Sequence, residues 1–143
     1  HHRKERIMRE IKFRAWKHSS KKMYFVTNMI WKEDWIGVNS TDSIGINYVD
    51  NRLPNEFELM QYTGLKDKNG VEIYEGDIVT EEGGIFKGEV RIGEYPSFAS
   101  DSKDEEHFGW YAFRQKDARH QPLLELYKLE VIGNIYENQE LLK

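Results

Sequence analysis

Apolar and polar residues alternate in several short segments of this chain, which is the pattern of half-buried β-strands. The most regular segment covers residues 86–92, where apolar residues and one glycine occupy every second position and charged residues lie between them. The same pattern predicts further strands at residues 11–16, 23–26, 58–63, 71–74, 78–79, 108–113 and 129–136. Residues 123–128 fit either a strand or a short helix, so the chain is predicted to be mainly β, in the range from all-β to α+β.

Turn signals separate these segments. Asn69-Gly70 is a strong short-range turn signal, because both residues tolerate left-handed backbone angles. A polar turn over residues 17–22 predicts that the first two strands form a hairpin, and Gly76-Asp77 forms the entry to another strand. Residues 27–57 show no regular pattern, so their structure is not assigned.

Short strands at these intervals are typical of a small barrel or sandwich. The segment from Gly76 to Tyr136 suits an SH3-like barrel. We therefore expect an N-terminal β subdomain at residues 8–63, which packs on or interleaves with an SH3-like barrel subdomain at residues 64–143 to form one compact unit. Residues 1–7 begin with two histidines and precede Met8, so they are predicted to be a tag or leader remnant.

Three blocks of the sequence resemble the YopX family of small proteins from bacteriophages and prophages of Gram-positive bacteria. The blocks are REIKFRAW at residues 9–16, LMQYTGLKDKNGVEIYEGDIV at residues 59–79 and LEVIGNIYENQELL at residues 129–142. Lys17 and Gln139 stand where Asp and Pro are expected in the family, and both are turn or cap positions. The resemblance implies a phage or prophage accessory protein of uncharacterised activity, and it supplies no catalytic residues.

The composition indicates in which cellular compartment the protein is located. The chain has 143 residues, which suffices for one ordinary domain, and it has no cysteine, so disulfides and thiolate metal sites are excluded. No apolar run approaches the roughly 20 residues needed to cross a bilayer. The charged N-terminus contains no apolar signal segment. The predicted location is therefore the cytoplasm of the bacterial host, without membrane association.

Charge is unevenly distributed along the chain. Residues 1–22 contain nine Lys or Arg and two Glu, a net charge of +7, and because the whole chain carries −4 the remainder carries −11. The predicted N-terminal hairpin combines basic and aromatic residues, as single-stranded nucleic-acid sites do. Its candidate contacts to nucleic acid or another partner are Arg14, Trp16, Lys17, Lys21, Lys22 and Tyr24. The alternative is a solvated strand whose aromatic residues belong to the core.

Self-association is the principal functional hypothesis. The predicted strand at residues 108–113 is rich in apolar residues on both faces, which leaves surface that one small barrel does not cover. Opposite charge on separate segments favours ordered contacts between subunits. We therefore expect a non-enzymatic binding and assembly module that forms a homo-oligomer, with a phage or host protein as a further partner and nucleic-acid binding as the alternative.

Catalytic and metal-binding patterns are weak by comparison. His18, His107 and His120 are far apart in sequence and lack metal-ligand spacing. Glu75 and Asp77 flank Gly76 and could serve a metal-dependent hydrolase, but residues in such a turn more often accept backbone N–H groups. The sequence therefore predicts no enzyme activity, no cofactor and no metal site.

Overall fold

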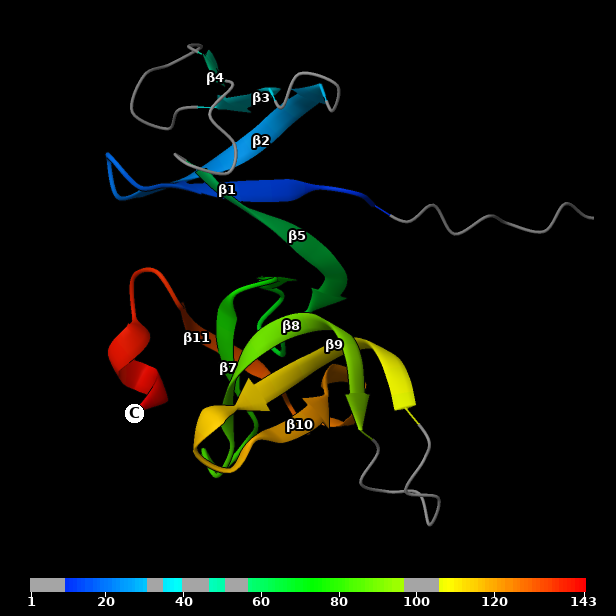
Figure 1. Cartoon of the computed structure of the whole chain (residues 1–143). Helices are drawn as coiled ribbons and strands as arrows, with labels where there is room; N and C mark the ends of the chain where they lie inside the picture. The colour runs from blue at the N-terminus through cyan, green and yellow to red at the C-terminus, as the bar shows by residue number, and fades with distance from the viewer. Residues whose placement is uncertain (1–9, 31–34, 40–46, 51–56, 97–105) are drawn as a thin grey trace, which may run out of the picture.

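The structure, a computed structural model, describes residues 10–30, 35–39, 47–50, 57–96 and 106–143. Within these ranges it contains two antiparallel β-sheets and short 3-10 turns, and no α-helix. Figure 1 shows the N-terminal sheet above the C-terminal one, with the chain crossing between them. In the described part of the chain, no helix has the length and apolar character needed to span a membrane.

The N-terminal sheet contains strands β1 to β6. They are β1 at Phe13–Lys17, β2 at Lys22–Ile30, β3 at Trp35–Asn39, β4 at Asn47–Asp50, β5 at Phe57–Lys66 and β6 at Glu72–Tyr74. Their order in the sheet is β4-β3-β2-β1-β5-β6. The predicted hairpin is formed by β1 and β2, and Lys21 in its turn has a positive φ of 53°.

The C-terminal sheet contains strands β7 to β11. They are β7 at Asp77–Thr80, β8 at Lys87–Pro96, β9 at Glu106–Arg114, β10 at Arg119–Pro122 and β11 at Glu130–Asn134. Their order is β10-β9-β8-β7-β11, and β8 curves strongly, so that the sheet curls on itself (Figure 1). Short 3-10 turns lie at Gln115–Asp117, Leu123–Glu125 and Gln139–Leu142.

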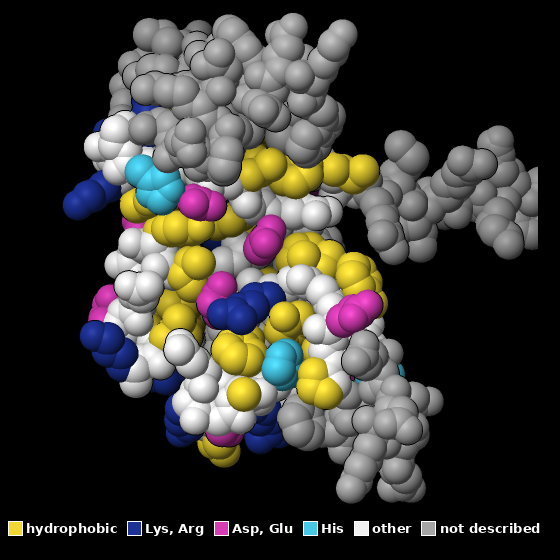
Figure 2. All heavy atoms as spheres, in the orientation of Figure 1, with side chains coloured by type: hydrophobic (Ala, Val, Ile, Leu, Met, Phe, Trp, Pro, Cys, Tyr) yellow, Lys and Arg dark blue, Asp and Glu magenta, His cyan; other side chains and the backbone are white. Residues whose placement is uncertain are grey.

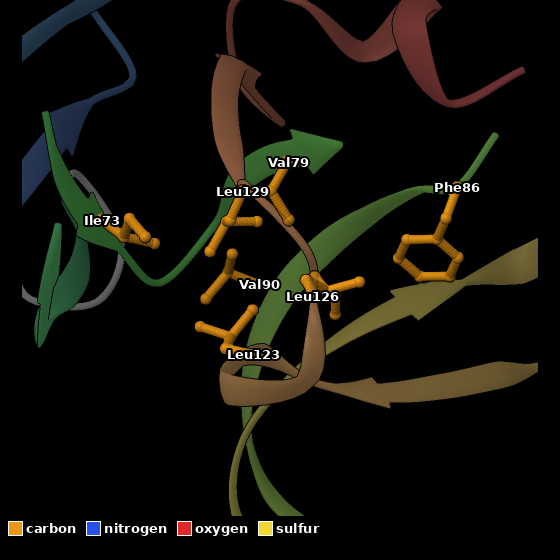
Figure 3. Close-up of a cluster of buried hydrophobic side chains, with 8 residues drawn as sticks. Ile73, Val79, Phe86, Val90, Leu123, Leu126 and Leu129 are labelled. Carbon is orange, nitrogen blue, oxygen red and sulfur yellow. The ribbon is translucent and has the colours of Figure 1, made fainter. Parts of the chain in front are cut away.

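The main core lies inside the curled sheet. Val79, Val90, Leu123, Leu126 and Leu129 point toward one another in Figure 3. Val79 and Val90 have no exposed surface, and the Leu123–Glu125 turn directs Leu123 into the same cluster. A smaller cluster, of Ala15, Tyr24 and Phe57, lies in the N-terminal sheet.

The prediction of a mainly β fold, with a curled barrel-like sheet and an additional N-terminal sheet, is confirmed. Residues 123–128, for which the sequence allowed either a strand or a short helix, begin as a 3-10 turn that places Leu123 in the core. Two strands, β3 and β4, lie in the unassigned region at residues 27–57. Residues 1–7, predicted to be a tag or leader remnant, lie outside the described residues.

Candidate binding groove

One end of the junction between the two sheets is closed by a buried ion pair. Arg14 in β1 donates from Nη2 to Oδ1 of Asp77 at 2.6 Å, and the two side chains are 12% and 2% exposed. Oδ2 of Asp77 accepts the backbone N–H of Tyr74 at 2.8 Å, and the Arg14 guanidinium lies 4.7 Å from the centre of the Tyr74 ring. Burial raises the pKa of the Asp77 carboxyl, and the Arg14 charge opposes that shift. The pair therefore joins β1 to the entry of β7.

Aromatic and glycine contacts complete the closed end. The Trp16 ring stacks on Tyr136 with centroids 5.4 Å apart and an interplanar angle of 15°. Gly76 has a φ of +86°, and a Cβ there would lie 3.1 Å from the sulfur of Met60. A side chain at position 76 would thus be strained and crowded, so glycine is required for the close approach of the sheets.

The other end of the junction remains open as a groove of about 580 Å³ between β5 and the strands β8 and β9. Pockets for small-molecule ligands commonly have volumes of about 300–1,000 Å³. Figure 2 shows hydrophobic side chains at the surface where β5 approaches β8 and β9. The apolar lining comes from Ile11, Tyr62, Ile92, Phe108 and Trp110.

The β8 and β9 wall continues the face that forms the core. Val90 pairs with Ala112, and both are fully buried. Two residues further along, Ile92 pairs with Trp110, and Ile92 is 39% exposed. Phe108, next on the same face of β9, is 73% exposed. The apolar face therefore extends beyond the part of the sheet that other elements cover, and the excess lines the groove.

The opposite wall of the groove has charged residues at its rim, and ion pairs hold their side chains in place. Lys12 forms ion pairs with Glu10, at 2.9 Å, and with Glu72. Hydrogen bonds to Glu10 and then to Glu72 raise the pKa of Lys12. Its Nζ also lies 4.9 Å from the centre of the Tyr62 ring. Ile11, between Glu10 and Lys12 in sequence, is 73% exposed and lines the groove.

The structure divides the six predicted contact residues of the hairpin into two groups. Arg14 and Trp16 are held in the junction between the sheets, and Tyr24 is buried in the small N-terminal cluster. The other three are the lysines at the hairpin tip. Lys17 is half-buried, with Nζ 5.7 Å from the centre of the Phe57 ring, whereas Lys21 and Lys22 are exposed.

This division changes what a nucleic-acid contact could use. Trp16 and Tyr24 are 7% and 4% exposed, so their rings present no free face for a base to stack on. Nucleic-acid binding at the hairpin stays the alternative to assembly, and the three lysines at the tip are the residues that could carry it.

The carboxylate pair considered for hydrolysis has local structural partners. Asp77 is paired with Arg14, and Oε1 of Glu75 accepts the backbone N–H of Gln61 at 3.3 Å. Among the residues that the structure describes, no three His, Cys, Asp or Glu side chains gather in a way that could hold a metal ion.

The groove itself was not identified from the sequence. The signal was present in part, because the segment at residues 108–113 is apolar on both faces. The other wall of the groove is formed by Ile11 and residues 61–64. These residues are far from residues 108–113 in the sequence and come close to them only in the folded chain.

Comparison with known proteins places the chain in a family. The family model for YopX protein matches residues 12–143. No curated protein matches the chain. The crystal structure of protein EF1440 from Enterococcus faecalis is similar over 94% of this chain and 99% of that one, with 27% sequence identity and a TM-score of 0.50. The chain therefore belongs to the YopX family.

Proposed function

We propose that the protein is an accessory protein of a bacteriophage or prophage, and that it acts in the cytoplasm of the bacterial host as a non-enzymatic binding and assembly module. The observation that carries this proposal is the open groove with exposed apolar walls. Burial of apolar surface contributes about 25 cal/mol per Å², so Ile11 and Phe108 offer favourable contact area to a protein partner.

The charged groups near the junction support binding over catalysis. Arg14, Asp77 and Lys12 are each engaged in ion pairs that hold the sheets or the groove rim in place. Catalysis by Asp77 would need a carboxyl that can reach a substrate, and its side chain is only 2% exposed.

Affinity capture from phage-infected cells tests this proposal, with nuclease treatment to remove contacts that depend on nucleic acid. We expect a partner to be retained by the wild-type chain and lost from the Ile11→Ser, Phe108→Ser double variant. Ile85→Ser is the matched control, because Ile85 is 82% exposed and does not line the groove. If the wild-type and double-variant chains retain the partner equally, the groove is not its binding site.

Self-association is the form of assembly that we propose for the protein alone. Apolar side chains outside the groove are also exposed, by 55% to 84%: Phe25, Leu124 and Tyr127. A second copy that covers such residues would remove apolar area from water, and the opposite charges of the N-terminal segment and the remainder would orient the contact. Light scattering should show a mass that rises with concentration, and a monomer at all concentrations in physiological salt would refute self-association.

A further inference from the structure

We infer that the groove receives an extended segment of a partner protein, which adds as a strand along the open edge of β8. The inference rests on the proposed binding function and specifies the partner as an extended peptide that carries apolar residues and a basic residue on the same face. Addition of a strand to an exposed edge gives affinity through the main chain and specificity through alternate side chains.

The edge of β8 becomes available partway along the strand. Its pairing with β7 ends at Ile78↔Glu89, and the last contact on that side is the backbone N–H of Gly76, which donates to the carbonyl of Val90 at 2.9 Å. Beyond Val90, no described strand pairs with this edge. Pairing with β9 on the other edge continues without a register shift to Pro96.

The direction of the free backbone groups follows from this register. The carbonyl of Val90 points away from β9, and backbone groups alternate along a strand, so those of Ile92 and Glu94 point away from β9 as well. Pro96 has no N–H and ends the available stretch. The open edge therefore offers the N–H and C=O groups of Ile92 and Glu94 to an incoming strand.

The opposite wall leaves room for such a strand. Pairing of β5 with β1 ends at Phe13↔Gln61, and the N–H of Tyr62 donates to the carbonyl of Lys12 at 2.8 Å. After this point β5 continues into the groove lining at Thr63 and Gly64. The groove is thus lined by the edge strand β8 beyond its pairing with β7 and by the part of β5 beyond its pairing with β1.

The lining specifies the side chains of the partner. Ile92 and Glu94 lie on the same face of β8, beside Phe108 and Trp110 of β9. In an added strand every second side chain would lie on this face, where apolar groups fit the groove. Glu94 is exposed at the end of this face, so a lysine or arginine on the same face of the partner strand would meet its carboxylate.

A synthetic probe tests the inference directly. The probe is a fluorescein-labelled heptapeptide in which threonine alternates with two valines and, near one end, a lysine, so that the valines and the lysine share one face. Its binding to the whole chain is measured by fluorescence anisotropy. A second peptide carries N-methyl groups on the edge that would face β8, and a third has the same composition with its valines grouped together. We expect both altered peptides to bind about tenfold more weakly, because each loses hydrogen bonds or alternation.

Variants of the protein supply the complementary test. Glu94→Pro removes the outward N–H without removing a β8–β9 hydrogen bond, and Glu94→Gln is its matched control because it removes only the charge. We expect about a tenfold loss for Glu94→Pro, a smaller and salt-dependent loss for Glu94→Gln, and about a tenfold loss for Phe108→Ser. Ile85→Ser should leave binding unchanged.

The outcomes separate the inference from the function on which it rests. Equal binding of the N-methylated peptide to the wild-type chain would overturn strand addition, and this comparison does not depend on the folding of any variant. If that peptide binds equally but Phe108→Ser still weakens binding, the groove binds a partner in another way and the proposed function stands. Absence of probe binding would also overturn the inference, whereas the capture experiment above tests the function independently.

Discussion

The two ends of the junction between the sheets differ in how their side chains are used. At the closed end, Arg14 pairs with Asp77 and Trp16 stacks on Tyr136. At the open end, Ile11 and Phe108 are each 73% exposed beside a groove. Both ends are built from strands of the same alternating type. The difference shows that alternation determines which face a side chain lies on, whereas the neighbouring elements determine whether that face is covered.

Removal of the buried Asp77 carboxylate should cause the largest loss in the free energy of unfolding. Asp77→Asn leaves the Arg14 guanidinium without its counter-charge in a buried site, and loss of one partner of a buried pair costs about 3–5 kcal/mol. Urea denaturation should show this loss in the free energy of unfolding. Asp117→Asn is the control, because the Arg114–Asp117 pair is a surface pair whose carboxylate side chain is 45% exposed, and it should have far less effect. Similar losses for the two variants would contradict a special role for the closed end.

Truncations on one sheet face should separate covered from uncovered positions. Val90→Ala removes fully buried methyl groups and should cost about 2 kcal/mol. Phe108→Ala, on the same face of the sheet but largely exposed, should change stability by less than about 0.5 kcal/mol. The measurement is again the free energy of unfolding in urea. A large loss for Phe108→Ala would mean that this ring supports the fold and is not available to a partner.

The tyrosine at the closed end should titrate abnormally. Burial, followed by the charges of nearby glutamates such as Glu58, raises the pKa of Tyr136 to about 12, from 10.0. The neutral ring therefore contributes stability that is fully present below pH 10.0 and is lost as the pH rises through about 12. Absorbance at about 295 nm, where tyrosinate absorbs, should show a titration component near pH 12, and Tyr136→Phe should reduce it. Late titration from Tyr62, Tyr74 and Tyr95 should remain, because burial raises their pKa values as well. A normal titration in the wild-type protein would indicate that the stacked ring is accessible to solvent.

Substitution of the lysines at the hairpin tip should have the smallest effect. Lys21→Glu with Lys22→Glu should leave the groove and its peptide binding unchanged, because the lysines do not line the groove. We expect no saturable binding of a labelled single-stranded oligonucleotide to the wild-type chain, since the rings of Trp16 and Tyr24 are buried. Binding that weakens with added salt and with the double substitution would instead support the nucleic-acid alternative.

Local sequence signals predicted much of the fold. The alternation over residues 86–92 begins one residue before β8 and continues into it, and the polar turn at residues 17–22 does join β1 to β2. At the candidate contacts, the sequence correctly indicated a hairpin rich in charge and aromatic residues. It could not indicate that Arg14 and Trp16 point to the sheet junction, because Asp77 and Tyr136, their partners, lie far away in the chain.

The sequence by itself determined the mainly β class, the positions of the turns and the face on which each strand residue lies, since these depend on neighbours within a few positions. Tertiary structure alone decided which faces are buried and which remain open. That choice depends on contacts such as Met60 against Gly76, and on where the pairing of β7 with β8 ends. The groove exists because two strands separate where the curled sheet still has apolar side chains to present, and this follows from the packing of distant segments.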